Sequence, residues 1–327
     1  MCDIDATAMM NTGRDDFVRS IAPRYGWGET LRVTPQIGGY VAEVFLIETA
    51  TQIGWLKCYD RQRAITQRVL ADADFHLPVT HWLQHHSAIT GRITAPYQTF
   101  DGQYMVDYGG RYVAVMFDYI VGRTLRESPL TPTQRTHLVT TVALMHGLTT
   151  QVPLPAHTVI EDFGAPWSRP LAQMLEGEWE LFDADVRAEL TPHRQMLQAM
   201  LVRFVQAGYL LRRHPPELVL CHTDIHGYNV IVNGDQTYLL DFEGLKLAPV
   251  EHDFMFWVDD AAWPEMLATY QQIRPGVVPD PHLIRFYQER RLLEDVYDYL
   301  EQLRYEQLTP ELHAKVCDSL RQLLVGT

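Results

Sequence analysis

The chain has 327 residues, 46% of them hydrophobic, and its 41 acidic residues outnumber the 27 basic ones, for a net charge of −14. This length exceeds one comfortable hydrophobic core and predicts two lobes. The absence of a long apolar run argues against a membrane protein, the acidic charge argues against nucleic-acid binding, and four scattered cysteines favour reduced thiols in a cytoplasmic protein.

The first part of the chain predicts a small sheet with one or two helices. A helix is expected near 14–25, and strands are expected at 44–47 and 53–59. Before them lies Gly38-Gly39-Tyr40. A glycine pair lets backbone amides approach phosphate groups closely, although a hairpin also needs glycine for steric reasons.

Lys57 is a single cation in an otherwise apolar strand, and it is the only lysine before Lys246. Either it has a dedicated role, or it is a strand lysine that faces solvent. A helical stretch follows from 61 to 86, in which Pro78 is expected to begin a new helix.

Two further strands, 104–106 and 111–117, lead into a polar connector that ends at Gly122. An apolar strand that continues into such a connector suits the recognition of a purine edge by backbone groups, although many ordinary connectors between lobes look the same. The residues concerned are Asp118, Tyr119 and Ile120.

The second part of the chain is predicted to be mainly helical. Thr131 caps a helix that ends near Gly147, with Pro132 in its first turn. Further helices are expected near 167–182, 184–190, 192–213, 262–272, 280–304 and 310–325.

The most informative segment is CHTDIHGYNVIVNGDQTYLLD, residues 221–241. It predicts a loop, a strand, a tight turn and a return strand that ends on a carboxylate. Asp224, Asn229 and Asp241 would then meet at one end of a hairpin. A carboxylate base, an amide oxygen and a second carboxylate are the groups that a magnesium-dependent phosphoryl transfer requires.

This segment resembles the HxDxxxxN motif and the Asp-led metal triplet shared by protein kinases and the aminoglycoside phosphotransferase/choline kinase families. The matching residues are His222-Thr223-Asp224, Asn229 and Asp241-Phe242-Glu243. The continuation Leu247–Phe256 looks closest to spectinomycin-type aminoglycoside phosphotransferases.

The resemblance implies an α+β, bilobal, protein-kinase-like fold. Residues 1–118 would form a nucleotide-binding lobe with a small antiparallel sheet, and residues 119–327 a larger, mainly helical catalytic and substrate-binding lobe. ATP and Mg²⁺ are the implied cofactors, and 116–122 would be the connector that holds adenine.

The same resemblance assigns roles to the matched residues. Asp224 would be the base, Asn229 and Asp241 would hold Mg²⁺, and Lys57 would contact the α- and β-phosphates. The family's lysine is usually held by a glutamate on the next helix, but no glutamate occurs between Glu48 and Glu127. Asp72 or Asp74 is favoured as its replacement, and the role of Glu243 stays open.

Acidic residues are concentrated beyond residue 118: that part has 28 acidic and 17 basic residues, whereas residues 1–118 have 13 and 10. This distribution favours a cationic substrate, although solubility alone explains many acidic surfaces. Candidate substrate residues are the late acids and two tryptophans that could stack on sugar rings or ammonium groups. They are Asp259, Asp260, Glu265, Glu294, Asp295, Asp298, Trp257 and Trp263.

The sequence therefore predicts transfer of the ATP γ-phosphoryl group to a hydroxyl of a small cationic molecule of the aminoglycoside or aminocyclitol type. A kinase for choline, homoserine, methylthioribose or a sugar is the first alternative. A catalytically silent nucleotide-binding protein is the second. The oligomeric state and the preference for ATP over GTP are left open.

Overall fold

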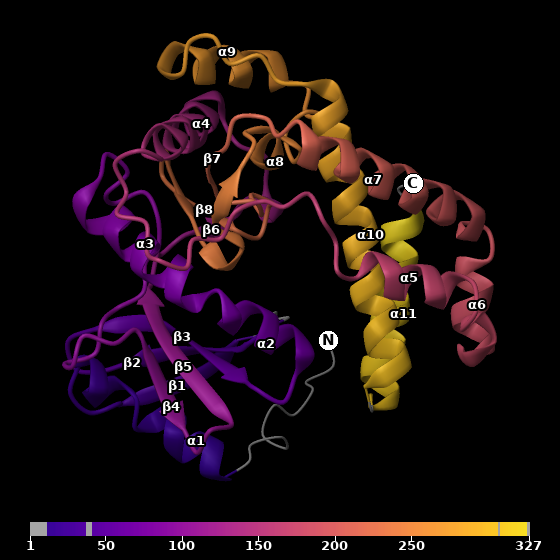
Figure 1. Cartoon of the computed structure of the whole chain (residues 1–327). Coiled ribbons are helices and arrows are strands. Elements are labelled where there is room, and N and C mark those ends of the chain that lie inside the picture. Colours follow the sequence, from indigo (N-terminus) through magenta and orange to yellow (C-terminus); the bar gives the residue numbers. More distant parts are fainter. Residues whose placement is uncertain (1–11, 37–40, 307, 326–327) are drawn as a thin grey trace. The chain divides into compact units, whose positions relative to one another are not determined.

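The computed structural model describes residues 12–36, 41–306 and 308–325 (Figure 1). Its contacts divide the chain into two compact units that each draw on separate segments. Unit 1 comprises the described residues up to Val159 together with Val219–Leu247 and Ala261–Val277. Unit 2 comprises Ile160–Leu218, Ala248–Asp260 and the described residues from Val278 onward. The division into lobes at residue 118 stays a prediction.

Unit 1 contains a five-stranded antiparallel sheet in the order β1-β2-β3-β5-β4 (Figure 1). Buried and more exposed side chains alternate along β2 and most of β3, whereas residues 113–116 of the inner strand β5 are all buried. Their bounds are β1 Arg32–Gln36, β2 Glu43–Glu48, β3 Ile53–Asp60, β4 Met105–Tyr108 and β5 Tyr112–Asp118.

Alternation along β3 decides which way Lys57 faces. Leu56 and Cys58 join a core with Phe17 of α1 (Thr12–Arg19) and the 3-10 helix η1 (Ala22–Tyr25). Tyr59 belongs to a separate core with Leu77 of α3 (Ala73–His86). Because strand residues alternate between faces, Lys57 shares the face of Tyr59 and α3.

The helical stretch after β3 is interrupted at Asp72 instead of at Pro78. α2 (Ala64–Ala71) ends there and α3 begins one residue later, with Pro78 inside it. The expectation that Pro78 begins a new helix is therefore wrong. Phe75, Leu77 and Val79 are buried around the proline, and their packing stabilises a helix that lacks one backbone hydrogen bond.

The motif segment forms the predicted hairpin. β8 (Val230–Asn233) pairs antiparallel with β9 (Gln236–Leu239), and β6 (Arg123–Thr124) adds to β8. Gly234 adopts a φ of +59°, which the tight turn requires and glycine tolerates. The remaining elements of this region are η2 Leu125–Glu127, α4 Pro132–Gly147, β7 Val219–Cys221, η4 Phe242–Gly244, β10 Lys246–Ala248 and α9 Trp263–Ile273.

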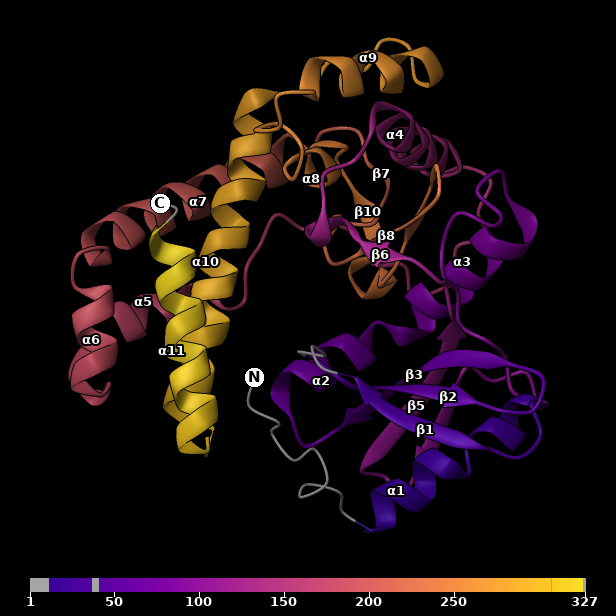
Figure 2. The same ribbon diagram turned by 180° about the vertical axis from the view of Figure 1, so that it is seen from behind.

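Unit 2 is mainly helical over the residues that the structure describes. Its core joins apolar side chains of α7 with those of α10 and α11, and the last two lie side by side (Figure 2). The bounds are α5 Ser168–Leu175, η3 Trp179–Leu181, α6 Ala184–Leu190, α7 Arg194–Arg213, α8 Glu251–Phe254, α10 Pro281–Tyr305 and α11 Pro310–Val325.

These elements confirm the predicted α+β fold class, with an antiparallel sheet in the N-terminal region and a mainly helical C-terminal region. The predicted helix after Thr131 is confirmed, because α4 begins at Pro132 with a capping box formed by Thr131 and Gln134. The short strands β6, β7 and β10 were not expected, because two or three residues carry no recognisable period. Among the described residues, no helix has the length and apolarity needed to cross a bilayer.

Candidate active site

The three motif residues lie at one end of the β8–β9 hairpin. Val230 pairs with Leu239, and the backbone N–H of Leu240 donates to the carbonyl of Asn229 at 2.9 Å. Asn229 therefore comes just before β8 and Asp241 two residues after β9 ends. This register brings the two predicted metal ligands to the same end of the hairpin.

Asn229 and Asp224 are in direct contact. The Nδ2 of Asn229 donates to the carbonyl oxygen and to Oδ2 of Asp224, both at 2.9 Å. Both hydrogen bonds use Nδ2, and Oδ1 of Asn229 makes no hydrogen bond within the described residues, so it keeps its lone pairs. An amide oxygen of this kind beside carboxylates fits a hard divalent cation such as Mg²⁺.

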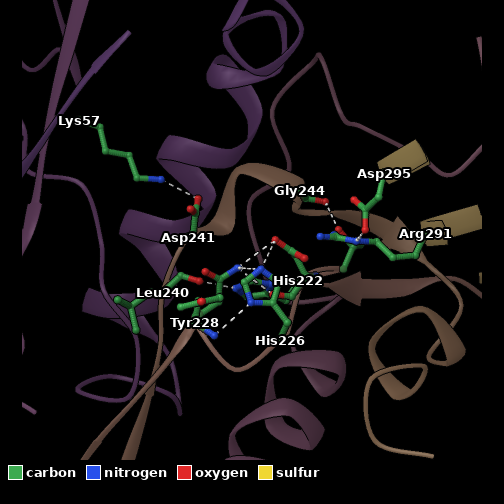
Figure 3. Close-up of polar contacts among 12 residues, drawn as sticks. Lys57, His222, His226, Tyr228, Leu240, Asp241, Gly244, Arg291 and Asp295 are labelled. Carbon is green, nitrogen blue, oxygen red and sulfur yellow. Dashed lines mark hydrogen bonds and ion pairs between the residues drawn. The ribbon is translucent and has the colours of Figure 1, made fainter. Parts of the chain in front are cut away.

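The loop that carries Asp224 is held by side chains next to it. His222 donates from Nε2 to the carbonyl of Leu240 at 2.7 Å, and its Nδ1 accepts from the backbone N–H of Asp224 at 3.2 Å (Figure 3). Thr223 has a φ of +70°, and its Oγ1 donates to the carbonyl of Gly244 at 2.8 Å. These bonds fix the loop against the segment that follows the hairpin.

His226 is a contact of Asp224 that sequence reasoning missed. Its Nδ1 accepts from the backbone N–H of Tyr228 at 3.1 Å, so the proton of a neutral ring lies on Nε2. That Nε2 lies 3.4 Å from Oδ2 of Asp224. The available signal was its place two residues after Asp224, inside the motif segment.

Lys57 makes ion pairs with two carboxylates. Its Nζ lies 2.7 Å from Oδ1 of Asp241 and 2.6 Å from Oε1 of Glu243, and Figure 3 shows the side chain directed at Asp241. The hydroxyl of Tyr59 donates to the same Oε1 at 2.6 Å. We call Lys57, Tyr59, Asp241 and Glu243 the Lys57 cluster.

Burial and charge oppose each other in this cluster. Burial alone would lower the pKa of Lys57, but Asp241 and Glu243 outweigh it and raise that pKa above its usual value. Burial, together with the charge of Asp241, raises the pKa of Glu243. One cation thus faces two carboxylates, and the surplus negative charge favours an additional cation.

The structure corrects the expected partner of Lys57. Asp72 lies 3.2 Å from Nε2 of His157, and Asp74 is exposed on α3, whereas Asp241 and Glu243 bind the lysine. His76 of α3 is buried, and its Nε2 makes no hydrogen bond within the described residues. Burial and the charge of Lys57 lower the pKa of His76 to about 4, which keeps the ring neutral.

The other predicted nucleotide contacts are placed as follows. Gly38, Gly39 and Tyr40 lie outside the described residues. Oδ2 of Asp118 accepts from the backbone N–H of Ala95 at 2.9 Å, which fixes the end of β5. Tyr119 packs its ring against Trp55 at 5.3 Å, and Ile120 follows in the connector.

The predicted substrate residues belong to different units. Trp263 and Glu265 begin α9 in unit 1, and the others lie in unit 2. Several acids have partners of their own: Asp295 lies 3.0 Å from Arg291 (Figure 3), and Asp259 accepts from Gln288 at 3.1 Å. Glu294 lies 3.8 Å from Arg290, Asp260 is exposed, the Asp298 carbonyl accepts from Gln302, and Trp257 packs against Phe254.

Comparisons with known proteins show the family of the chain and its fold. A sequence profile of the phosphotransferase enzyme family (APH) matches residues 38–287. The chain belongs to this family and is a small-molecule kinase that uses an alcohol group as acceptor. No curated protein sequence matches the chain significantly.

Solved structures with the same fold include three enzymes of distant sequence. Spectinomycin phosphotransferase APH(9)-Ia, in complex with ADP and spectinomycin, is 18% identical, with 94% of this chain and 93% of that chain covered and a TM-score of 0.70. A microcompartment-associated aminopropanol kinase is 15% identical, with 94% and 95% covered and a TM-score of 0.58. The amicoumacin kinase hAmiN, in complex with AMP-PNP and Ca²⁺, is 14% identical, with 90% and 88% covered and a TM-score of 0.53.

Proposed function

We propose that the protein transfers the γ-phosphoryl group of Mg·ATP to a hydroxyl of a small cationic molecule of the aminoglycoside or aminocyclitol type. The observation that carries this proposal is that two polar contacts lie at the same end of the β8–β9 hairpin. There the Asp224–Asn229 contact at 2.9 Å adjoins the ion pair between Asp241 and Lys57 at 2.7 Å.

In this proposal Asp224 accepts the proton of the substrate hydroxyl and orients that hydroxyl for attack. Asn229 supports the role, because its Nδ2 fixes Oδ2 of Asp224 and leaves Oδ1 for the metal. Asn229 and Asp241 would hold Mg²⁺, and Lys57 would neutralise further phosphate charge. Bound Mg²⁺ supplies neutralisation of the charge that develops on the phosphates.

The proposed class of acceptor rests on the net charge of −14. Arginines one turn earlier on α10 partly neutralise Glu294 and Asp295, which reduces the negative charge available to a polycationic substrate. A kinase for a small metabolite such as choline, homoserine, methylthioribose or a sugar is therefore the second candidate. Both candidates share the same base and metal ligands.

The test is release of ADP in the presence of Mg·ATP and a panel of aminocyclitols, aminoglycosides and small metabolites. With an active acceptor, Asp224→Asn should reduce turnover roughly 10²- to 10⁴-fold, because the general base is lost. The affinity for Mg·ADP should stay close to that of the wild type. Asp235→Asn, in the exposed turn of the hairpin, is the matched control and should leave turnover unchanged.

Other outcomes distinguish the alternatives. Turnover of one of these small metabolites but of no aminoglycoside or aminocyclitol would select the second candidate. Tight binding of Mg·ADP without turnover of any acceptor would favour a silent nucleotide-binding protein. Normal turnover by Asp224→Asn at saturating ATP would contradict the role of this residue.

A further inference from the structure

The two acids that pair with Lys57 in the Lys57 cluster differ in solvent exposure. Nζ of Lys57 lies 2.7 Å from Asp241 and 2.6 Å from Glu243. The side chain of Asp241 is 34% exposed, whereas that of Glu243 is only 12% exposed. Asp241 is therefore the acid that an incoming cation can reach, and Glu243 is enclosed.

Glu243 is also held from a second side. Its Oε1 accepts from the hydroxyl of Tyr59 at 2.6 Å, and Tyr59 is itself 1% exposed. Tyr59 and Lys57 are two residues apart on β3, so both point to the same face of the sheet. One carboxylate oxygen thus joins two neighbouring side chains of one strand, which fixes its position relative to the lysine.

No acid of the helical stretch after β3 takes this place. Of the two aspartates there, Asp72 binds His157 and Asp74 is exposed. Among the titratable side chains of α3 the buried one is His76, which is 4% exposed and carries an Nε2 without a hydrogen bond in the described structure. A neutral imidazole cannot balance the charge of an ammonium group.

The contact with Glu243 follows from packing between distant segments. η4, which carries Glu243, packs against α3, and Asp241 just before it adopts a φ of +65°. The left-handed turn at Asp241 lets residues 241 and 243 both reach Lys57, although they lie 184 and 186 residues further along the chain. A left-handed backbone conformation costs free energy for a residue that has a Cβ, and the contacts around Asp241 must compensate for that cost.

We propose that Glu243 is the positioning residue for Lys57, in place of an acid on the helix that follows the strand. This inference rests on the proposed function. Glu243 holds the lysine where it meets the nucleotide phosphates, with Tyr59 fixing the carboxylate. Asp241 remains able to turn from the lysine toward the metal while Glu243 keeps its contact.

The competing role for Glu243 is that of a further metal ligand. The two roles differ in their dependence on the lysine. A positioning residue acts through Lys57, so its effect must vanish when the lysine is removed. A metal ligand acts on the cation directly, so its effect must persist in the absence of the lysine.

The experiment is a double-mutant cycle on Mg·ADP binding, measured by calorimetry with Lys57→Met, Glu243→Gln and the double variant. With Lys57 present, Glu243→Gln should weaken Mg·ADP binding about tenfold. In the Lys57→Met background the same change should alter affinity by less than about twofold. Glu48→Gln at the end of β2 is the matched control and should bind as the wild type does.

Tyr59→Phe provides a second arm that changes no charge. It should weaken Mg·ADP binding about threefold with Lys57 present and have no effect without it. Equal effects of Glu243→Gln in both backgrounds, including no effect in either, would overturn the inference and leave the proposed function standing. Failure of the wild type to bind Mg·ADP would overturn both.

Discussion

The Lys57 cluster in unit 1 and the Arg290–Glu161 pair in unit 2 both bury a cation against carboxylate, but they differ in balance. Arg290 donates from Nη1 to both oxygens of Glu161 at 2.9 and 2.8 Å, and the side chain of Glu161 is 1% exposed. A second acid, Glu294, lies further from Arg290, at 3.8 Å, whereas Lys57 lies within 2.7 Å of two carboxylates, one of them 34% exposed. We call Arg290 and Glu161 the closed pair, because both side chains are almost fully enclosed. The Lys57 cluster instead has one close carboxylate more than its single cation can neutralise.

The closed pair holds the backbone that enters unit 2. Oε1 of Glu161 also accepts from the backbone N–H of Phe163 at 2.7 Å, and Phe163 has a φ of +54°. The carbonyl of Phe163 accepts from Arg212 at 3.0 Å and lies so close to α7 that a Cβ on Gly208 would be 2.3 Å from it. A balanced buried pair stabilises a fixed backbone, whereas a cluster with surplus acid remains ready for a further cation.

The largest effect on stability should come from removing the cation of the closed pair. Arg290→Met leaves the carboxylate of Glu161 buried without its partner, which should lower the free energy of unfolding by about 3 kcal/mol. Chemical denaturation measures this loss. Mg·ADP affinity should not change, because the pair lies outside the Lys57 cluster.

Arg285→Met is the control for that substitution. Arg285 is 69% exposed and forms an i,i+4 pair with Glu289, so its removal should cost less than about 1 kcal/mol. Equal losses for the two arginines would show that the buried pair has no special structural role.

A smaller effect is expected from pH at His76, which borders the Lys57 cluster. Its pKa is lowered from 6.5 to about 4, so the unfolded chain binds a proton over a pH range in which the folded protein does not. Stability is therefore present above pH 6.5 and is lost as the pH falls toward 4. Between pH 7.5 and 5 the wild type should lose about 2 kcal/mol more than His76→Gln.

The charged groups facing His76 are Lys57, which lowers its pKa, and Asp241, which opposes that shift. Both remain in the variant, and titration of the other carboxylates cancels in the difference between the two proteins. Parallel curves of unfolding free energy against pH would contradict a neutral, buried His76.

The smallest effect is expected at Asp72, one of the two acids that the sequence favoured as the partner of Lys57. Asp72 is 40% exposed and pairs with a His157 that is 62% exposed. Asp72→Ala should therefore change Mg·ADP affinity by less than about twofold and stability by less than about 1 kcal/mol. A tenfold loss of affinity would indicate that Asp72 supports Lys57 after all, and would contradict the role given to Glu243.

Local sequence determined several of the elements that carry the candidate site, and their order along the chain. The helix start at Pro132, the hairpin of β8 and β9, and the strand that carries Lys57 all follow from capping, turn chemistry and alternation. The meeting of Asn229 and Asp241 at one hairpin end follows as well, because the turn at Gly234 sets the register.

Only the tertiary structure decided the partner of Lys57, because that contact depends on how η4 packs against α3 and on the left-handed backbone of Asp241. The same holds for the contact of His226 with Asp224 and for the break at Asp72 instead of Pro78. Periodicity and capping report what a segment prefers along its own length. The choice between Asp72, Asp74 and Glu243 is made by side chains from segments far apart in the chain, and no local pattern encodes it.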